Sequence, residues 1–223
     1  MSGYYSERLS AERLRKCYQI APPRIRQYLE AETTHVADRI RPSDVVLELG
    51  CGYGRVVERL ADGAGMVVGV DTSESSLRLA REYLAGKDNC RLLQMNAVAM
   101  GFCDQAFDMV ACIQNGVSAF NVDQRALIGE CIRVTRPGGR VLLSSYSERF
   151  WRDRLEWFQL QADHGLLGEI DPARTGNGVI VCKDGFTATT VSRNDLLSLT
   201  SGFHVRTHIE EVDESSLFCE IMV

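Results

Sequence analysis

Residues 44–55 constrain the fold of this chain more than any other stretch, because an apolar run there meets three alternating glycines. Residues 45–49 are almost unbroken in apolar character, which is typical of a strand buried on both faces of a parallel sheet. Gly50, Gly52 and Gly54 follow, and glycine allows both a sharp turn and a close backbone approach to a ligand. Apolar residues then recur at helical spacing. The stretch predicts a strand, a glycine turn and a helix, with a nucleotide bound at the carboxyl end of the strand.

A carboxylate follows one strand later. Residues 66–70 predict the next strand, which ends in Asp71, about 20 residues past the first glycine. A carboxylate at this distance is in the expected place to hold ribose hydroxyls. A glycine-rich turn alone is a weak signal, because many such turns only join a strand to a helix. A binding site is favoured because a strand, the glycines, a helix, a second strand and an aspartate follow one another at the expected spacing.

The glycine spacing does not fit a dinucleotide site. Such a site needs a third glycine three residues after the second, where this chain has Arg55. The pattern is instead Gly-x-Gly-x-Gly preceded by Glu48, which resembles motif I of the class I S-adenosylmethionine-dependent methyltransferases, here of the small-molecule kind. Residues 101–108 and 133–143 are also similar to stretches of that family. The resemblance covers roughly 44–146 by motif and 192–223 by architecture only.

The resemblance implies that S-adenosyl-L-methionine is the cofactor. It places Asp71 at the ribose hydroxyls, and Asn96 at the adenine, where an amide offers both a donor and an acceptor. Asn96 could instead be a simple turn residue. Gln114, at the end of the predicted strand 107–113, would face the methyl group and its acceptor. The expected cofactor-binding residues are Glu48, Gly50, Cys51, Gly52, Tyr53, Asp71, Thr72, Asn96, Ala97, Gln114 and Asn115.

The expected fold is one α/β domain with a Rossmann-like, mostly parallel seven-stranded sheet, an antiparallel C-terminal hairpin and helices on both faces. The last two predicted strands, 204–211 and 216–223, are too close for a crossover helix and must pair antiparallel. An NAD-binding domain would continue with further βαβ units instead. The expected parts are an N-terminal helical cap (1–42), a cofactor-binding core (43–146), a substrate-side insertion (147–191) and a C-terminal helix and hairpin (192–223).

Composition narrows the class of partner. The 223 residues are 45% hydrophobic and 25% charged, as in an ordinary soluble protein. The net charge of −5, without a long basic run, argues against a sequence-independent grip on nucleic-acid phosphates. We expect no membrane span and no signal peptide.

The eight cysteines form no Cys-x-x-Cys pair, so they predict reduced, mostly buried thiols, a cytoplasmic location and no metal site. His204 and His208 fall in one predicted strand, about 13 Å apart, too far for a single zinc ion.

The methyl acceptor is the least constrained element. Residues 114–117 read Gln-Asn-Gly-Val, without the prolines typical of enzymes that methylate base amino groups, and no Pro-Cys dipeptide occurs. These absences argue against a nucleic-acid substrate and favour a small-molecule acceptor. Protein or RNA methylation, or a non-catalytic S-adenosylmethionine-binding module, stay open as alternatives, and the oligomeric state cannot be read. An alcohol acceptor would need a general base, whereas a thiolate or neutral amine needs little help. Candidates for the substrate side, each of which could simply pack or be solvated, are Tyr4, Tyr5, Tyr18, Tyr146 and His164, with Arg26 and Glu148 beside them.

Overall fold

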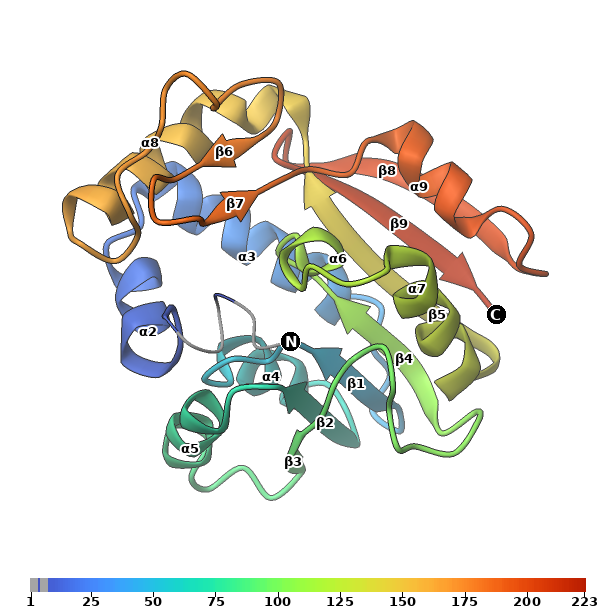
Figure 1. The fold of residues 1–223 in the computed structure, drawn as a ribbon. Coiled ribbons are helices and arrows are strands. Elements are labelled where there is room, and N and C mark those ends of the chain that lie inside the picture. Colours follow the sequence, from blue (N-terminus) through green and yellow to red (C-terminus); the bar gives the residue numbers. More distant parts are fainter. Residues whose placement is uncertain (1–3, 5–7) are drawn as a thin grey trace.

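The computed structural model describes residue 4 and residues 8–223, which are organised on a seven-stranded sheet (Figure 1). The strand order is β3-β2-β1-β4-β5-β9-β8. The first five strands run parallel, whereas β9 pairs antiparallel with both β5 and β8. This topology confirms the predicted α/β fold with its antiparallel C-terminal hairpin. The strands are β1 (Val45–Leu49), β2 (Met66–Asp71), β3 (Cys90–Gln94), β4 (Phe107–Cys112), β5 (Thr135–Tyr146), β8 (Arg206–Val212) and β9 (Ser216–Met222).

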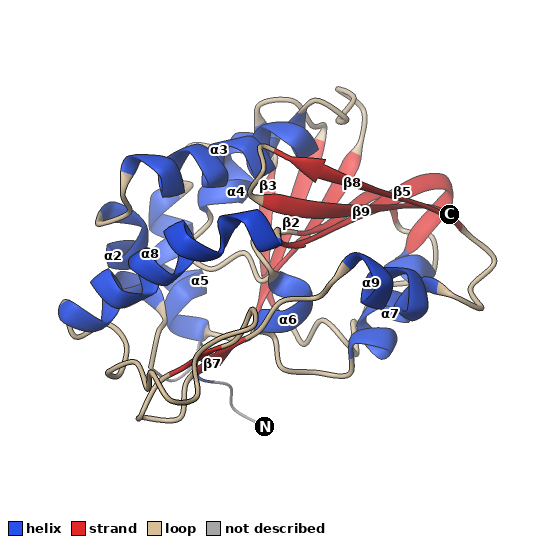
Figure 2. Cartoon of the chain, turned by 90° about the horizontal axis from the view of Figure 1, so that it is seen from above, coloured by secondary structure: helices blue, strands red, loops and turns tan. Residues whose placement is uncertain are grey.

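Helices cover both faces of the sheet (Figure 2). Helices α3, α4 and α5 lie on one face, and α6, α7 and α9 lie on the other. Helices α2 and α8, with a hairpin of β6 (Ile180–Val181) and β7 (Thr187–Ala188), stand beyond the carboxyl ends of the parallel strands. The helices are α2 (Ala11–Gln19), α3 (Pro23–Ala37), α4 (Arg55–Ala61), α5 (Glu74–Tyr83), α6 (Gly116–Ala119), α7 (Gln124–Val134), α8 (Trp151–Asp163) and α9 (Arg193–Thr200).

Buried apolar side chains form three clusters. Successive strand residues point to opposite faces of the sheet, so Val46 joins the cluster under α3, α4 and α5 while Leu47 joins the cluster under α7 and α9. The third cluster lies off the sheet, where Tyr28 of α3, Trp157 of α8 and Phe186 of the hairpin pack together with α2. The N-terminal helices and the segment after β5 therefore share an apolar core of their own.

The start of β5 differs from the sequence-based prediction. The proline and glycines of residues 136–140 predict a tight turn between helix and strand, but this prediction is wrong, since β5 begins at Thr135 directly after α7. Gly138 has a φ of +79°, and the register against β4 shifts at this point, so the glycines form an irregularity inside the strand. The Gly138 N–H donates to the carbonyl of Val223 (2.7 Å), which keeps the segment paired with the end of the sheet.

Two other boundaries differ. The apolar spacing predicts a helix over residues 24–40, but α3 ends at Ala37. The Arg39 side chain donates to a backbone carbonyl four residues earlier (2.9 Å), which satisfies an acceptor that the helix end leaves open. His204 lies before β8, which begins two residues later, so the two histidines do not share the strand that the sequence predicted.

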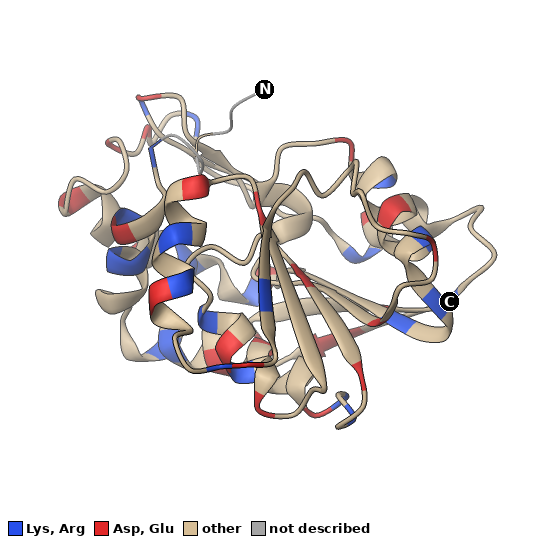
Figure 3. Ribbon diagram, turned by 90° about the horizontal axis from the view of Figure 1, so that it is seen from below, with Lys and Arg blue, Asp and Glu red and all other residues tan. Residues whose placement is uncertain are grey.

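Charged side chains are spread over the helices and loops (Figure 3). Lys and Arg are interspersed with Asp and Glu, and most of the sheet carries neither. Within residues 4 and 8–223, no helix is long and apolar enough to cross a membrane. The same residues contain no group of three or more His, Cys, Asp or Glu side chains that could hold a metal ion. All eight cysteine thiols are free, and most of them are buried.

Candidate active site

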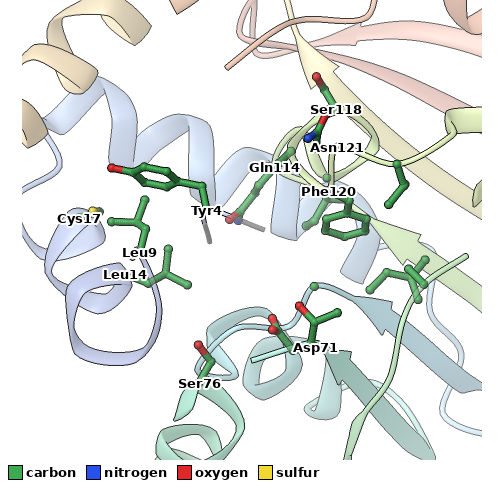
Figure 4. A pocket seen from close by; sticks show the side chains of 18 of the residues that line it. Tyr4, Leu9, Leu14, Cys17, Asp71, Ser76, Gln114, Ser118, Phe120 and Asn121 are labelled. Atoms are coloured by element: carbon green, nitrogen blue, oxygen red, sulfur yellow. The ribbon is translucent and has the colours of Figure 1, made fainter. Parts of the chain in front are cut away.

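The carboxyl ends of β1, β2 and β4 open into a pocket of about 510 Å³, closed on the other side by α2, α3, α8 and the β6–β7 hairpin. Figure 4 shows Asp71 approaching from β2, Gln114 from the segment after β4, and Tyr4 from the N-terminal segment. The only charged side chains that line the pocket in the described part of the chain are Glu48 and Asp71. We call the end around these two carboxyl groups the acidic lobe. The opposite end is the aromatic lobe, lined by Tyr18, Tyr28, Tyr146, Trp157, Phe158 and Phe186.

The glycine loop after β1 takes a backbone shape that other residues resist. Gly50 and Gly52 have φ values of +72° and +53°. The N–H groups of Gly50 and Cys51 both donate to the carbonyl of Val70 (2.8 and 3.0 Å), which pins the loop to the end of β2. A Cβ on Gly50 would lie 2.5 Å from the Phe120 ring. The sequence therefore needs glycine here both for the turn and for the close approach.

Asp71 ties the glycine loop to helix α5. One carboxylate oxygen accepts the N–H of Gly52 (2.8 Å) and the other accepts the N–H of Ser73 (2.7 Å). Burial raises the pKa of Asp71, although these N–H donors act in the opposite direction. Ser73 caps α5 by accepting the N–H of Ser76. A carboxylate has about four acceptor positions, so Asp71 retains capacity toward the pocket, which Thr72 also lines.

Glu48 presents an unpaired oxygen at the acidic lobe. The residue is only 4% exposed and lines the pocket, and its Oε2 has no hydrogen-bond partner in the described part of the chain. Burial raises the pKa of Glu48 to about 8, while Arg55 opposes the shift and Asp71 adds to it. A buried polar atom without a partner is costly, so this carboxyl oxygen marks a place where a hydrogen bond with a ligand would be stabilising.

The predicted adenine residues also reach the pocket. Asn96 and Ala97 line it just beyond the end of β3. The Asn96 Oδ1 accepts the N–H of Val98 (3.1 Å), so this side chain also shapes a local turn. The two interpretations of Asn96, as turn residue and as pocket wall, are compatible in this geometry.

Gln114 and Asn115 hold a strained backbone where the two lobes meet. Their φ values are +56° and +63°, and consecutive left-handed residues other than glycine are uncommon. Gln114 lines the pocket and accepts the Tyr18 hydroxyl at Oε1 (3.2 Å). Asn115 is buried behind the wall instead, where it donates to the carbonyl of Thr189 (2.9 Å) and accepts from Ser145 (3.0 Å). The short helix α6, which the sequence did not predict, begins directly afterwards.

The buried carboxyl group of Glu32, which was not predicted from the sequence, stabilises this strained backbone. Glu32 of α3 is fully buried and accepts the N–H of Gln114 (2.6 Å) and the hydroxyls of Ser144 (3.0 Å) and Ser216 (2.5 Å). Burial raises the pKa of Glu32 to about 7, against the effect of these donors. A signal existed in the sequence, since Glu32 falls on the apolar face of α3, four residues after Tyr28.

The aromatic lobe is assembled from distant segments. Trp157 of α8 donates to the carbonyl of Cys17 (3.1 Å), and Tyr4 donates to Asp184 of the hairpin turn (2.6 Å). Tyr4 also packs against Phe186 with ring centroids 4.9 Å apart. Three of the predicted substrate-side residues, Tyr4, Tyr18 and Tyr146, line the pocket. The fourth tyrosine, Tyr5, lies outside the described residues.

Several predicted residues lie away from the pocket wall. Cys51, Gly52 and Tyr53 are buried in or beside the glycine loop but do not line the pocket. His164 is exposed at the end of α8, with Nδ1 2.8 Å from the Leu160 carbonyl. Arg26 and Glu148 are also exposed, and Arg26 donates to a backbone carbonyl of its own segment. The structure does not bring these last three side chains to the site.

Comparison with known proteins identifies the family. Residues 46–139 match the family model described as a methyltransferase domain. The chain is 33% identical over 153 residues to the ubiquinone/menaquinone biosynthesis C-methyltransferase UbiE of Klebsiella pneumoniae, covering 66% of this chain and 57% of the relative. It is 34% identical over 102 residues to a demethylmenaquinone methyltransferase of Clavibacter sepedonicus, covering 46% of this chain and 41% of the relative. The methyltransferase domain of residues 46–139 therefore belongs to the class I S-adenosylmethionine-dependent methyltransferases.

Solved structures share the fold over almost the whole chain. The PH0226 protein of Pyrococcus horikoshii covers 98% of this chain and 97% of its own, with a TM-score of 0.68 and 21% identity. CalS10, an amino pentose methyltransferase of Micromonospora echinaspora, covers 86% of this chain and 90% of its own, with a TM-score of 0.59 and 19% identity. The chain spans about half the length of the curated relatives that it matches.

Proposed function

We propose that this protein transfers a methyl group from S-adenosyl-L-methionine to a small-molecule acceptor. The observation that carries the proposal is one continuous pocket, in which an acidic lobe at the glycine loop joins an aromatic lobe at Gln114. The two lobes have the different chemistries that a charged cofactor and a separate acceptor require. The family membership of the chain supports the same assignment.

The residues of the acidic lobe fit the cofactor. The pocket volume of about 510 Å³ falls in the range of small-molecule and cofactor sites. Asp71 has acceptor capacity for ribose hydroxyls, and Asn96 with Ala97 would hold the adenine. The unpaired Oε2 of Glu48, beside Gly50, would accept from the positively charged methionine portion. A positively charged ligand group would add to the effect of Arg55 in stabilising the ionised form of Glu48.

The chain's own residues position the partners and exclude water. The bound cofactor supplies an electrophilic methyl group on a sulfonium, so the protein needs no strong electrophile of its own. Gln114 would direct the acceptor toward the acidic lobe, held by the hydrogen bonds of Glu32 and Tyr18. Tyr4, Trp157 and the hairpin would cover the acceptor. Such positioning can contribute several powers of ten to a displacement reaction.

A small-molecule acceptor is favoured by the enclosure of the aromatic lobe and by the relatives, which are named for the methylation of quinone precursors and an amino pentose. The cap (1–42) and the insertion (147–191) would supply the acceptor wall. The net charge of −5, with Lys and Arg interspersed among Asp and Glu in the view of Figure 3, does not favour binding of RNA phosphates. The free thiols support a cytoplasmic protein. Protein methylation and a non-catalytic role in cofactor binding are outcomes that the following experiment separates.

The first experiment measures binding of S-adenosylmethionine and S-adenosylhomocysteine, with NAD as the comparison, by thermal shift and calorimetry. We expect both adenosyl compounds to bind and NAD not to bind. The second measures formation of S-adenosylhomocysteine with mixed small-molecule acceptors, a basic peptide and RNA. Binding without turnover on any acceptor would point to the non-catalytic module, and NAD binding in place of the adenosyl compounds would overturn the proposal.

A further inference from the structure

The aromatic lobe contains hydrogen-bonding groups that the protein itself leaves unused. The Gln114 amide accepts the Tyr18 hydroxyl at Oε1, and its Nε2 is buried without a partner in the described part of the chain. The Tyr28 side chain is fully buried, and its hydroxyl lies beside Tyr146 without a hydrogen bond of normal geometry. Both residues line the pocket. Unsatisfied buried donors are rare in folded proteins, so a ligand atom that accepts from them is the physical explanation.

The charges around the lobe select against ions. No Lys, Arg, Asp or Glu side chain lines the aromatic lobe in the described residues, so an ion of either sign would lose its water there without gaining a direct ion pair. Arg55 lies over the Tyr18 ring (4.7 Å to the centroid), and the buried Arg154 lies over the Tyr146 ring (4.4 Å). These guanidinium groups do not line the pocket, so they would repel a cation stacked on the rings without pairing directly with an anion.

The walls of the lobe are flat and apolar. Trp157, Phe158 and Phe186 line it together with the tyrosines, and all three are buried. Aromatic rings present large rigid surfaces, and they bind other rings in offset or edge-to-face arrangements. The shape and polarity of the lobe therefore match a ring more closely than a flexible polar chain.

We propose that the methyl acceptor is an uncharged, ring-bearing molecule, and that one of its oxygens accepts from Gln114 Nε2 and meets the Tyr28 hydroxyl. This inference deepens the proposed function and rests on it. Gln114 and Tyr28 are thus specificity residues, because they would hold the acceptor by an atom that a hydrocarbon lacks. The aromatic walls would set the ring plane, and Arg55 with Arg154 would disfavour cations.

The test uses three probes that share a phenol ring and differ in charge: 4-methylphenol (neutral), 4-hydroxybenzoate (anionic) and tyramine (cationic). Binding to the full chain is measured by calorimetry in saturating S-adenosylhomocysteine, so the result does not depend on turnover. We expect 4-methylphenol to bind at least about tenfold more tightly than either charged probe. Tighter or equal binding of a charged probe, or no binding of 4-methylphenol, overturns the inference.

Two variants assign the effect to the named residues. Tyr28→Phe removes only the hydroxyl, and Gln114→Met removes the amide at similar length. Each should weaken 4-methylphenol binding about threefold to tenfold. Tyr28→Phe should change Tm little, because the hydroxyl makes no hydrogen bond of normal geometry in the described part of the chain. Tyr83→Phe, which removes an exposed hydroxyl bonded to Glu58, is the matched control and should leave probe binding unchanged. Unchanged probe affinity in both pocket variants also overturns the inference.

The two levels of the hypothesis fail separately. Calorimetry with S-adenosylhomocysteine alone, before any phenol is added, tests the proposed function. Loss of that binding would remove the cofactor assignment and this inference with it. Cofactor binding with no preference for the neutral probe would remove only the inference about the acceptor.

Discussion

The acidic lobe and the aromatic lobe are built in opposite ways. The acidic lobe is local, since Asp71 reaches a glycine loop 19 residues before it and a helix start two residues after it. The aromatic lobe depends on contacts between distant segments, such as Trp157 with Cys17, 140 residues apart, and Tyr4 with Asp184, 180 residues apart. A local site should lose its ligand affinity when one side chain is changed. An assembled site should lose affinity when a substitution lowers the stability of the segments that form it.

The largest effect is expected at the centre of the acidic lobe. Asp71→Ala removes the acceptor for two backbone N–H groups and the carboxylate that faces the pocket. We expect S-adenosylhomocysteine affinity to fall about 100-fold or more, measured by calorimetry. Asp62→Asn, at an exposed carboxylate paired with Lys87, is the control. Unchanged affinity in Asp71→Ala would contradict both the assignment and the idea of a local site.

A smaller effect, in stability, is expected where the two lobes meet. Burial raises the pKa of Glu32 from its usual value near 4.5 to about 7, so the folded state favours the protonated form. The stabilisation from this proton is complete below about pH 4.5 and is lost as the pH rises through 7. Wild-type protein should therefore lose stability relative to Glu32→Gln across this window, by on the order of 2 kcal/mol.

Thermal unfolding at a series of pH values between 5 and 8 checks this prediction. Glu30→Gln, on the exposed side of the same helix, controls for the loss of one negative charge. A constant difference in Tm between Glu32→Gln and wild type over the whole range would show that the proton on Glu32 does not contribute.

The assembled character of the aromatic lobe is tested at Arg154. Its guanidinium donates to the carbonyls of Gly178 and Ala188 (both 3.0 Å) and lies over Tyr146, so it joins α8 to the hairpin. Lysine cannot reproduce this planar fork. Arg154→Lys should lower the unfolding free energy by about 1–2 kcal/mol and weaken acceptor binding. Affinity for S-adenosylhomocysteine should stay as in wild type.

Denaturant unfolding and calorimetry measure the two quantities on the same sample. Arg152→Lys, an exposed position of the same helix, is the control. If Arg154→Lys lowered cofactor affinity as much as acceptor affinity, the two lobes would behave as one unit. That result would contradict the distinction between a locally built acidic lobe and an aromatic lobe assembled from distant segments.

The smallest effect is expected at the turn of the β6–β7 hairpin, beside the N-terminal segment. Asp184 accepts the Tyr4 hydroxyl and lies 3.8 Å from Arg8, whose side chain is 60% exposed. Asp184→Asn keeps an acceptor for Tyr4 but removes the charge. We expect KM for the acceptor to rise about twofold to threefold at low salt, with the difference fading at high salt. Asp163→Asn, at the end of α8, is the control. A difference that persists at high salt would contradict an electrostatic role.

The same contrast explains what the sequence could predict. The glycine loop, Asp71 and the strands around them are encoded in short segments, and the sheet followed from regular alternation and from the two closely spaced final strands. Glu32 was missed because its hydrogen-bond partners come from β5, β9 and the segment after β4, which no local pattern connects. His164 failed as a pocket residue because its chemistry suited a base while its place on α8 faces outward.

The strand order also has a consequence for synthesis in the cell. Strand β5 is complete at residue 146, but β9, which pairs along its open side, begins only at residue 216, 70 residues later. At about 5–20 residues per second, a ribosome needs roughly 4–14 s to add those residues. During that interval the backbone of β5 has no partner on one side, and an unpaired strand edge is a template for wrong pairing. The yield of folded protein should therefore depend on translation speed and on chaperones that cover β5 until β9 has emerged.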